Sequence, residues 1–301
     1  MKISLFFALL IIFLSAGCMS EPVAFDENEA YLMLKEQTLF LHRYPEGKDI
    51  ALCRSYLREK LEPCCDIYKE QDFTIKIEGK KLNLKNIIGI INPKAERYIL
   101  LCSHYDNRPI SDKDKDISKR KNPCPGADDG ASSTAVLLET AKVFHSRKPD
   151  VGVVFVLFDG EDYGTEDETM YLGSRYFSEH YSEILDADKL KYGILLDMIG
   201  DSNLNIYIEK ISNYTAPELV QGVWSSAKKL GYEENFIPKT EYAMGDDHIQ
   251  LIECGIKCID IIDFDYKYWH TTEDTPDKCS PKSLKIVGDV IIDFVLSDFE
   301  F

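Results

Sequence analysis

The sequence has 301 residues, of which 45% are hydrophobic, and this suits one large globular domain or two small ones. Lysine and arginine total 35 against 52 aspartates and glutamates, which gives a formal net charge of −17. An acidic surface of this size repels phosphate backbones, so the composition argues against a nucleic-acid-binding protein.

The first 18 residues have the pattern of an export signal. A lysine precedes the apolar run Ile3–Leu14, which has signal-peptide length and is shorter than a membrane-spanning helix needs. Small residues then lead to Cys18, as in a bacterial lipobox, although Ser15 stands where an aliphatic residue is commoner. We expect a signal peptide over 1–18 with a lipid anchor on Cys18, a tether over 19–26, and a periplasmic or cell-envelope protein. An ordinary cleaved signal with an incidental cysteine is the alternative.

Eight cysteines follow the signal. In an exported protein an even number permits disulfides, but the pairing does not follow from the sequence. No Cys-x-x-Cys pairs recur at the spacing of a zinc ribbon, so we expect these residues to be structural. They are Cys53, Cys64, Cys65, Cys102, Cys124, Cys254, Cys258 and Cys279.

The first part of the chain after the tether predicts two helices and a hairpin. Apolar residues recur at helical spacing in 27–44 and again in 48–63, where Pro63 ends the pattern. Residues 72–79 and 82–93 are alternating or β-branched runs joined by Gly-Lys-Lys, which is typical of a β-hairpin.

From residue 97 onward, strand-like and helical patterns alternate. Strands are predicted over 97–106, 152–160, 191–201 and 255–265, and helices over 128–146, 171–181, 216–231 and 280–299. This alternation predicts an α/β three-layer sandwich with a mixed, mostly parallel central sheet, formed by a single domain over 27–301. The polar segment 110–126 interrupts the pattern, and we expect it to be an exposed loop.

Acids and histidines follow the apolar runs at the points where ligands bind in open α/β sheets, beyond the carboxyl ends of the strands. Four strands supply such residues, and two aspartates open the helix after the first of them. These residues are His104, Asp106, Glu161, Asp162, Asp197 and His270, with Asp128 and Asp129 at the helix start.

Each of these residues has a plain structural interpretation when taken alone. An aspartate at a helix start is usually an N-cap, a histidine after a strand is usually hydrogen-bonded, and a Glu-Asp pair is usually a solvated turn. Asp197 fits this less well, because it lies between "GILL" and "MIG" and a buried carboxylate needs a partner. Carboxylates that converge on one edge repel each other unless a divalent cation lies among them, and a mixed set of histidines and carboxylates suits zinc.

Seven segments together resemble the M28 zinc-peptidase clan. Within that clan they are most similar to the glutaminyl cyclases (glutaminyl-peptide cyclotransferases) of bacterial and animal type, and the similarity covers nearly the whole chain after the signal. The segments are "SHYDNRP", "PGADDGASSTAVLLE", "LFDGEDYG", "YLGSRYF", "GILLDMIGD", "DDHIQLIECGI" and "WHTTEDT".

The resemblance implies roles for the residues of the metal centre. Asp128, Asp162 and His270 match the ligands of the zinc that both branches of the clan hold. Glu161 matches the general base, and Asp197 matches a carboxylate that faces the substrate.

The resemblance also implies what would differ between the branches. In the two-zinc aminopeptidases, His104 and Asp197 would bind a second zinc bridged by Asp128, and Asp106 would orient the His104 ring, whereas the cyclases hold one zinc. In the cyclases, Asp246 would belong to a hydrogen-bond network near the substrate. Asp260 stands where animal cyclases have a histidine in that network, and their tryptophan between "GED" and "GSR" has no counterpart here. Trp269 matches a cyclase tryptophan that would stack on the ring being formed.

We therefore expect a zinc-dependent glutaminyl-peptide cyclotransferase that acts on peptides or proteins with N-terminal glutamine. The alternatives are a two-zinc M28 aminopeptidase and, in another class, a non-catalytic binding domain on the same fold. We expect a monomer that meets the membrane only through a lipid anchor at Cys18 and binds no nucleic acid.

Overall fold

The computed structural model of the chain describes residues 23–77, 79–297 and 299. The predicted signal peptide and Cys18 lie outside these residues, so export and lipidation stay predictions. Phe25, inside the predicted tether, is buried against the helix that carries Gly288. Among the described helices, none is both long and apolar enough to cross a membrane. The eight cysteines after the signal are all free.

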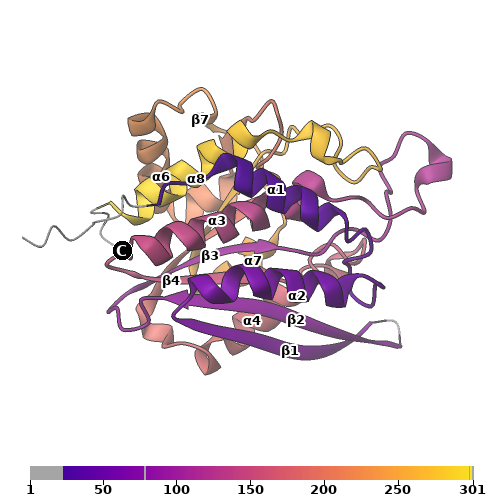
Figure 1. The fold of residues 1–301 in the computed structure, drawn as a ribbon, viewed down its shortest axis with the longest axis horizontal. Coiled ribbons are helices and arrows are strands. Elements are labelled where there is room, and N and C mark those ends of the chain that lie inside the picture. Colours follow the sequence, from indigo (N-terminus) through magenta and orange to yellow (C-terminus); the bar gives the residue numbers. More distant parts are fainter. Residues whose placement is uncertain (1–22, 78, 298, 300–301) are drawn as a thin grey trace, which may run out of the picture.

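The core of the fold is a six-stranded sheet with the order β1-β2-β4-β3-β5-β8. The hairpin β1–β2 pairs antiparallel with itself and with β4, while β3, β4, β5 and β8 run parallel (Figure 1). This confirms the predicted α/β class and the mixed, mostly parallel sheet. The strands are β1 (Ile67–Ile77), β2 (Lys80–Ile91), β3 (Tyr98–His104), β4 (Gly152–Phe158), β5 (Leu190–Asp197) and β8 (Lys257–Ile262).

Helices cover both faces of the sheet, which gives the predicted three layers (Figure 1). One face carries α1 (Glu27–Thr38), α2 (Ile50–Leu61), α3 (Ser133–Ser146), α6 (Pro217–Leu230) and α8 (Pro281–Val295). The other face carries α4 (Leu172–His180) and α7 (Asp247–Glu253). Helix α8, which was predicted over 280–299, is capped by Ser280, whose hydroxyl accepts from the Ser283 N–H at 3.0 Å.

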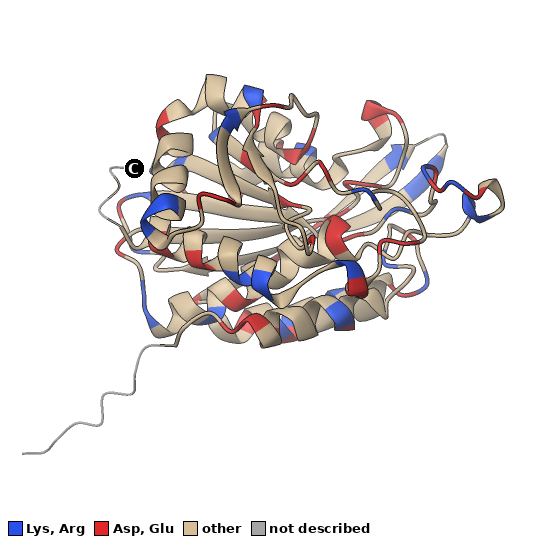
Figure 2. Cartoon of the chain, turned by 90° about the horizontal axis from the view of Figure 1, so that it is seen from above, with Lys and Arg blue, Asp and Glu red and all other residues tan. Residues whose placement is uncertain are grey.

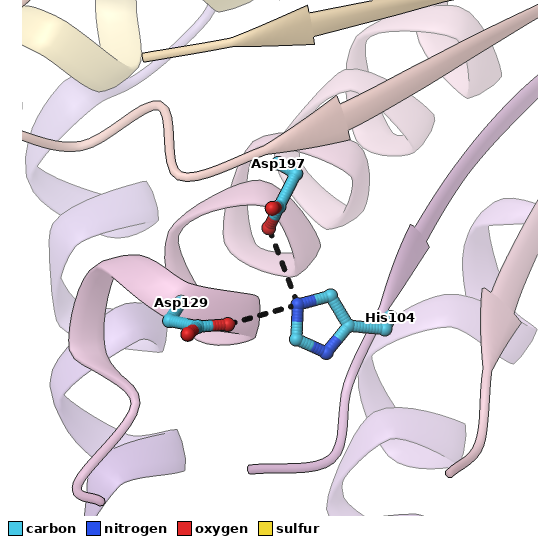
Figure 3. A group of neighbouring side chains, drawn as sticks. All are labelled: His104, Asp129 and Asp197. Carbon is cyan, nitrogen blue, oxygen red and sulfur yellow. Dashed lines mark hydrogen bonds and ion pairs between the residues drawn. The ribbon is translucent and has the colours of Figure 1, made fainter. Parts of the chain in front are cut away.

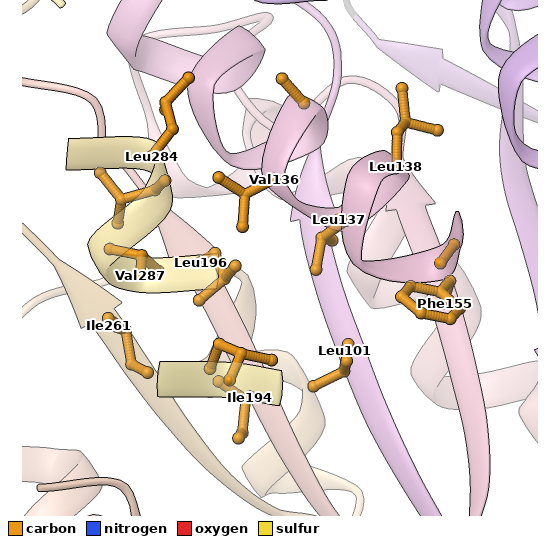
Figure 4. Packing of buried hydrophobic residues seen from close by; sticks show 14 of the residues in the cluster. Leu101, Val136, Leu137, Leu138, Phe155, Ile194, Leu196, Ile261, Leu284 and Val287 are labelled. Atoms are coloured by element: carbon orange, nitrogen blue, oxygen red, sulfur yellow. The ribbon is translucent and has the colours of Figure 1, made fainter. Parts of the chain in front are cut away.

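The central strands are apolar on both faces because each face packs against helices. All seven residues of β3 and of β4 are buried. Successive side chains alternate between the layers, so Leu101 joins the cluster under α3 and α8 while Leu100 joins the cluster under α4 and α7 (Figure 4). The charged residues lie mainly on the helices and loops, and the central strands carry few of them (Figure 2).

Several short elements have no counterpart in the sequence-based prediction. A two-stranded parallel sheet joins β6 (Ile206–Ile208) to β7 (Phe236–Thr240), and α5 (Lys210–Thr215) packs against β8. Helix α7 was also not predicted, although its N-cap Asp246 was expected near the site.

An ion pair between α2 and the end of β4 supports the loop that leads into the predicted site. The Arg54 guanidinium contacts the carboxylate of Asp159, which is fully buried and also accepts from the Lys85 N–H at 2.8 Å. Burial raises the pKa of Asp159 to about 6 from 3.8, even though the charge of Arg54 lowers it. Asp159 therefore depends on Arg54 to stay ionised inside the protein.

We predict that Arg54→Met lowers the free energy of unfolding by about 3–5 kcal/mol at pH 8, because it leaves a buried carboxylate unpaired. Without Arg54, the pKa of Asp159 in the folded variant rises further above the unfolded value of 3.8. Stability is lost as the pH rises from the unfolded pKa to the folded pKa, so the substitution lowers the free energy of unfolding less at pH 5 than at pH 8. Urea unfolding at both pH values measures this. Arg58→Met, which breaks the exposed pair with Glu62, is the control and should change stability little. Equal effects of the two variants at pH 8 would contradict the prediction.

Candidate metal centre

The parallel strands deliver the predicted site residues to one edge of the sheet. His104 is the last residue of β3 and Asp197 the last of β5, and their neighbours in register are Phe158 and Ile262 at the ends of β4 and β8. The loops that follow β4 and β8 add Glu161, Asp162 and His270. Segments far apart in the sequence therefore meet because the strands all end on the same side.

A first cluster joins His270, Asp162 and Asp129. His270 Nε2 lies 3.4 Å from Asp162 Oδ1 and 3.5 Å from Asp129 Oδ2, and one ligand atom from each residue lies within 4.8 Å of the others. All three side chains are buried. Ligands bound tetrahedrally to one zinc at about 2.1 Å lie about 3.4 Å apart, so this spacing fits one ion.

The hydrogen bonds of these carboxylates also fit a cation. Asp129 Oδ2 and Asp162 Oδ2 are buried and have no hydrogen-bond partner. A buried carboxylate oxygen without a partner is costly, and a metal ion removes the cost. Burial raises the pKa of Asp162 to about 7, with a further rise from Asp129 and opposition from His270 and Arg108. The residues present therefore fit a divalent ion such as zinc.

A second cluster shares Asp129 with the first. His104 Nε2 lies 3.2 Å from Asp129 Oδ1 and 3.2 Å from Asp197 Oδ1 (Figure 3). Asp129 thus turns one oxygen toward His104 and the other toward His270. A carboxylate divided in this way can bridge two metal ions.

The structure places Asp129, not Asp128, in both clusters, which corrects the residue expected from the sequence. The Asp128 carboxylate points elsewhere, and its Oδ1 accepts from the Gly200 N–H at 2.6 Å. The cause is the backbone, because residues Ala127–Ser132 do not continue α3 as the regular helix that we expected over 128–146. Asp129 has a non-helical ψ of 95° and Gly130 has φ of +92°.

Gly130 makes this kink possible. A Cβ at this position would lie 2.8 Å from the Asp106 carbonyl oxygen and 2.9 Å from His104 Cε1. Both its positive φ and this close approach require glycine. Neither aspartate therefore acts as the N-cap of a regular helix, which was the structural alternative.

Asp106 supports the site more widely than expected. Its Oδ1 lies 3.6 Å from His104 Nδ1, where the predicted orienting carboxylate should be. The same carboxylate accepts from the Glu161 N–H at 3.1 Å and from the Asp162 N–H at 3.3 Å. Asp106 therefore holds the loop after β4 as well as facing the His104 ring.

A group of buried carboxylates lies beside the two clusters. Burial raises the pKa of Glu161 well above its usual value, the charges of Asp162 and Asp246 raise it further, and His104 opposes them. Burial and Asp197 likewise raise the pKa of Asp246. Carboxylates whose pKa values are raised in this way are typical of sites that carry out acid–base chemistry.

Asp246 and Asp260 lie near each other behind the site. Asp246 caps α7 by accepting from the Asp247 N–H at 2.5 Å. Asp260, on β8, has two buried oxygens without a hydrogen-bond partner, and burial together with Asp246 and Asp197 raises its pKa. The His248 ring lies beside it, with Nδ1 3.9 Å from Asp260 Oδ2. The predicted network residues are therefore close in space, and their role stays a prediction.

Trp269 packs its indole against the His270 ring, with centroids 3.8 Å apart and planes 28° from parallel. It belongs to a small aromatic cluster with Phe264, whose ring centroid is 5.4 Å away. A flat aromatic wall thus stands directly beside a candidate metal ligand, and the substrate-binding role of Trp269 stays a prediction.

Three supporting residues were missed from the sequence. Asp274 accepts from the backbone N–H groups of Asp128 and Asp129, at 2.9 and 3.3 Å, and so fixes the kink. Arg108 contacts the carboxylate of Asp162, and Asp112 lies beside His270. Arg108 and Asp274 lie within the segments "SHYDNRP" and "WHTTEDT", whereas Asp112 lies in the polar segment 110–126 and had no such signal.

Comparison with known proteins agrees with this geometry. A family model described as peptidase family M28 matches residues 86–295. A leucine aminopeptidase precursor from Bacteroides thetaiotaomicron superposes with a TM-score of 0.88 at 34% identity, over 92% of this chain and 99% of that chain. A glutaminyl cyclase from the same organism, bound to N-acetylhistamine, gives 0.87 at 34% identity, over 92% and 100%.

One relative that is similar in sequence is much longer than this chain. Aminopeptidase YwaD of Bacillus subtilis is 28% identical over 243 residues, which are 74% of this chain and 47% of that protein. The chain therefore spans about half the length of this relative. The similar proteins include both cyclases and aminopeptidases, so they leave these two activities open.

We predict that Asp129→Asn removes bound zinc, since it takes an oxygen ligand from both clusters, and that Asp128→Asn retains it. Metal content after dialysis against zinc, measured by atomic emission, tests the difference. Asp128→Asn is the matched control because it changes the adjacent carboxylate. Zinc retained by Asp129→Asn and lost by Asp128→Asn would show that the original assignment was right.

Proposed function

Since the chain belongs to peptidase family M28, we propose that it is a zinc-dependent glutaminyl-peptide cyclotransferase. The reaction converts the N-terminal glutamine of a peptide to pyroglutamate and releases ammonia. The contact between Trp269 and His270 is the observation that carries the proposal, because it sets a flat aromatic face beside the metal cluster. Such a face suits a planar five-membered ring that forms next to the ion.

Zinc held by Asp129, Asp162 and His270 would act as a Lewis acid toward the side-chain amide carbonyl of the substrate. Glu161 would accept a proton from the attacking α-amine and return it to the departing nitrogen. One C–N bond forms between the amine and the side-chain carbonyl carbon, one C–N bond breaks, and the nitrogen leaves as ammonia. No water is consumed.

Two features of the chain suit this proton transfer. Glu161 is buried and its pKa is raised above its usual value, as suits a carboxylate that accepts a proton and then returns it. Asp197 lies at the end of β5 in the adjoining cluster with His104 and Asp129, and it would hold the amide nitrogen in place. Because the attack is intramolecular, orientation of the folded glutamine side chain supplies much of the rate enhancement.

The second cluster favours a second candidate, a two-zinc aminopeptidase. His104, Asp129 and Asp197 offer a separate set of buried ligand atoms within 4.8 Å of one another. With both sets filled, Asp129 would bridge the ions, and Glu161 would deprotonate a water that attacks the first peptide bond. A non-catalytic domain would have no need of a complete ligand set with a base beside it, and failure to bind zinc would favour that class.

The decisive assay uses two peptides, one beginning with glutamine and one with leucine. We predict that the purified protein with zinc releases ammonia from the first peptide and leaves its chain intact. Mass spectrometry should show this as a loss of about 17 Da, the mass of the ammonia released by acyl transfer. Release of free leucine from the second peptide, with no ammonia from the first, would overturn the cyclase in favour of the aminopeptidase.

We further predict that Glu161→Gln lowers kcat by about 10²–10⁴-fold, the usual contribution of a general base, and leaves zinc bound. Glu168→Gln, at an exposed position in the following loop, is the control and should keep normal activity and metal content. Turnover at the normal rate in Glu161→Gln would remove this residue from the role of base. Loss of zinc would instead make it a ligand.

A further inference from the structure

The segment Arg108–Asp116, here called the strap, lies against the loop that carries His270. It begins the polar insertion that we expected to be an exposed loop, and the outer part of that insertion does project from the molecule at the right of Figures 1 and 2. Its inner part is different. The Lys113 N–H donates to the His270 carbonyl oxygen at 3.1 Å, and Asp114 is buried.

Asp114 ties the strap to the residue two positions after the ligand. Its Oδ2 accepts from the Thr272 N–H at 3.1 Å and from the Thr272 hydroxyl at 2.5 Å. The other oxygen accepts from the Asp116 N–H at 2.9 Å, and the Asp114 carbonyl oxygen accepts from Arg120 Nε at 2.8 Å. The carboxylate is therefore held from both sides and forms a fixed point for the His270 loop.

Asp112 faces the ligand itself. Since His270 Nε2 is directed at Asp129 and Asp162, Nδ1 is the nitrogen left to carry a proton. Asp112 Oδ1 lies 3.4 Å from that Nδ1 and accepts from Arg108 Nε at 2.6 Å. Arg108 in turn contacts Asp162, so the strap joins two candidate ligands of one cluster.

The backbone of His270 explains why such support is needed. His270 has φ of +55°, in the left-handed region that is unfavourable for a residue with a Cβ. Surrounding contacts must fix such a conformation for it to persist. A ligating histidine also needs an acceptor for its second nitrogen, which sets the ring orientation and tautomer.

The spacing Asp-x-Asp-x-Asp at 112, 114 and 116 also occurs in calcium-binding loops, but these three carboxylates have separate partners. Asp112 faces Arg108 and His270, Asp114 faces Thr272, and Asp116 Oδ1 accepts from the Ser118 N–H at 2.9 Å. In the part of the chain that the structure describes, none of them belongs to a group with metal-binding spacing.

We propose that Asp112 and Asp114 are positioning residues that hold His270 in its zinc-binding orientation, Asp112 through the ring and Asp114 through the Thr272 backbone and hydroxyl. The proposal rests on the proposed function in so far as that function places zinc on His270. It goes beyond it by giving the polar insertion a role in metal affinity.

The test measures the zinc dissociation constant of the full chain by competition with a chromophoric chelator. We expect Asp112→Asn to weaken zinc binding about 10- to 100-fold, as loss of a carboxylate behind a ligating histidine usually does. Thr272→Val should also weaken it, and Thr272→Ser, which keeps the hydroxyl, should restore it. Asp116→Asn is the matched control on the same strap and should stay within about twofold of the wild type, because Asp116 does not contact the His270 loop.

Replacing zinc with Co²⁺ allows the metal's ligand environment to be measured by visible absorption, which a general loss of stability would not change. The visible absorption of bound Co²⁺ should change in Asp112→Asn and stay unchanged in Asp116→Asn, because only the former alters the histidine ligand. Asp114→Ala tests the same link, and if it fails to fold, Thr272→Val removes the same hydrogen bond from the other side.

Wild-type affinity and spectrum in both Asp112→Asn and Thr272→Val would overturn the proposal. Failure of the wild type to release ammonia, with zinc binding weakened as expected in these variants, would overturn the cyclase and support the role of the strap. Failure of the wild type to bind zinc at all would overturn both.

Discussion

The electrostatic cost of burying several carboxylates at one edge of the sheet is the constraint on which the rest of the structure depends. Asp129, Asp162 and Asp197 are almost inaccessible to water, and two of them have oxygens without hydrogen-bond donors. Such an arrangement is stable only with compensating positive charge. Arg108 supplies part of it at Asp162, and a divalent ion held by the two clusters would supply the remainder. The carboxylates at this edge of the sheet therefore outnumber the cationic side chains that contact them, as suits a site for a divalent cation.

Much of the fold could be predicted from the sequence, because strands buried on both faces leave continuous apolar runs and capped helices leave clear ends. The short elements α5, α7 and β7 could not, since five to seven residues do not establish a period. The sequence placed the shared aspartate at 128, one residue before the aspartate that lies in both clusters. Choosing between Asp128 and Asp129 required the kink at Gly130, which is set by the approach of Asp106 and His104 from another strand.

The contacts of the polar insertion lay beyond sequence reasoning for a similar reason. Asp114 and Thr272 are 158 positions apart, and neither has a neighbour in sequence that signals a partner. Composition indicated a solvated loop, and its tip agrees with this. The segment nearest the site instead forms partly buried hydrogen bonds with the loop after β8, which only the folded arrangement of β3 and β8 brings together. The average composition of a polar segment therefore does not predict the burial of those of its residues that lie next to a site.

One carboxylate, that of Asp106, accepts hydrogen bonds from the backbones of both Glu161 and Asp162. These two neighbours have different roles in the proposed chemistry, since Glu161 would transfer protons and Asp162 would bind the zinc ion. Because both backbone N–H groups are hydrogen-bonded to one carboxylate, we expect the two residues to move together and to keep their spacing when the loop fluctuates. The spacing between the proposed base and the neighbouring candidate ligand is thereby tied to Asp106, just beyond the end of β3.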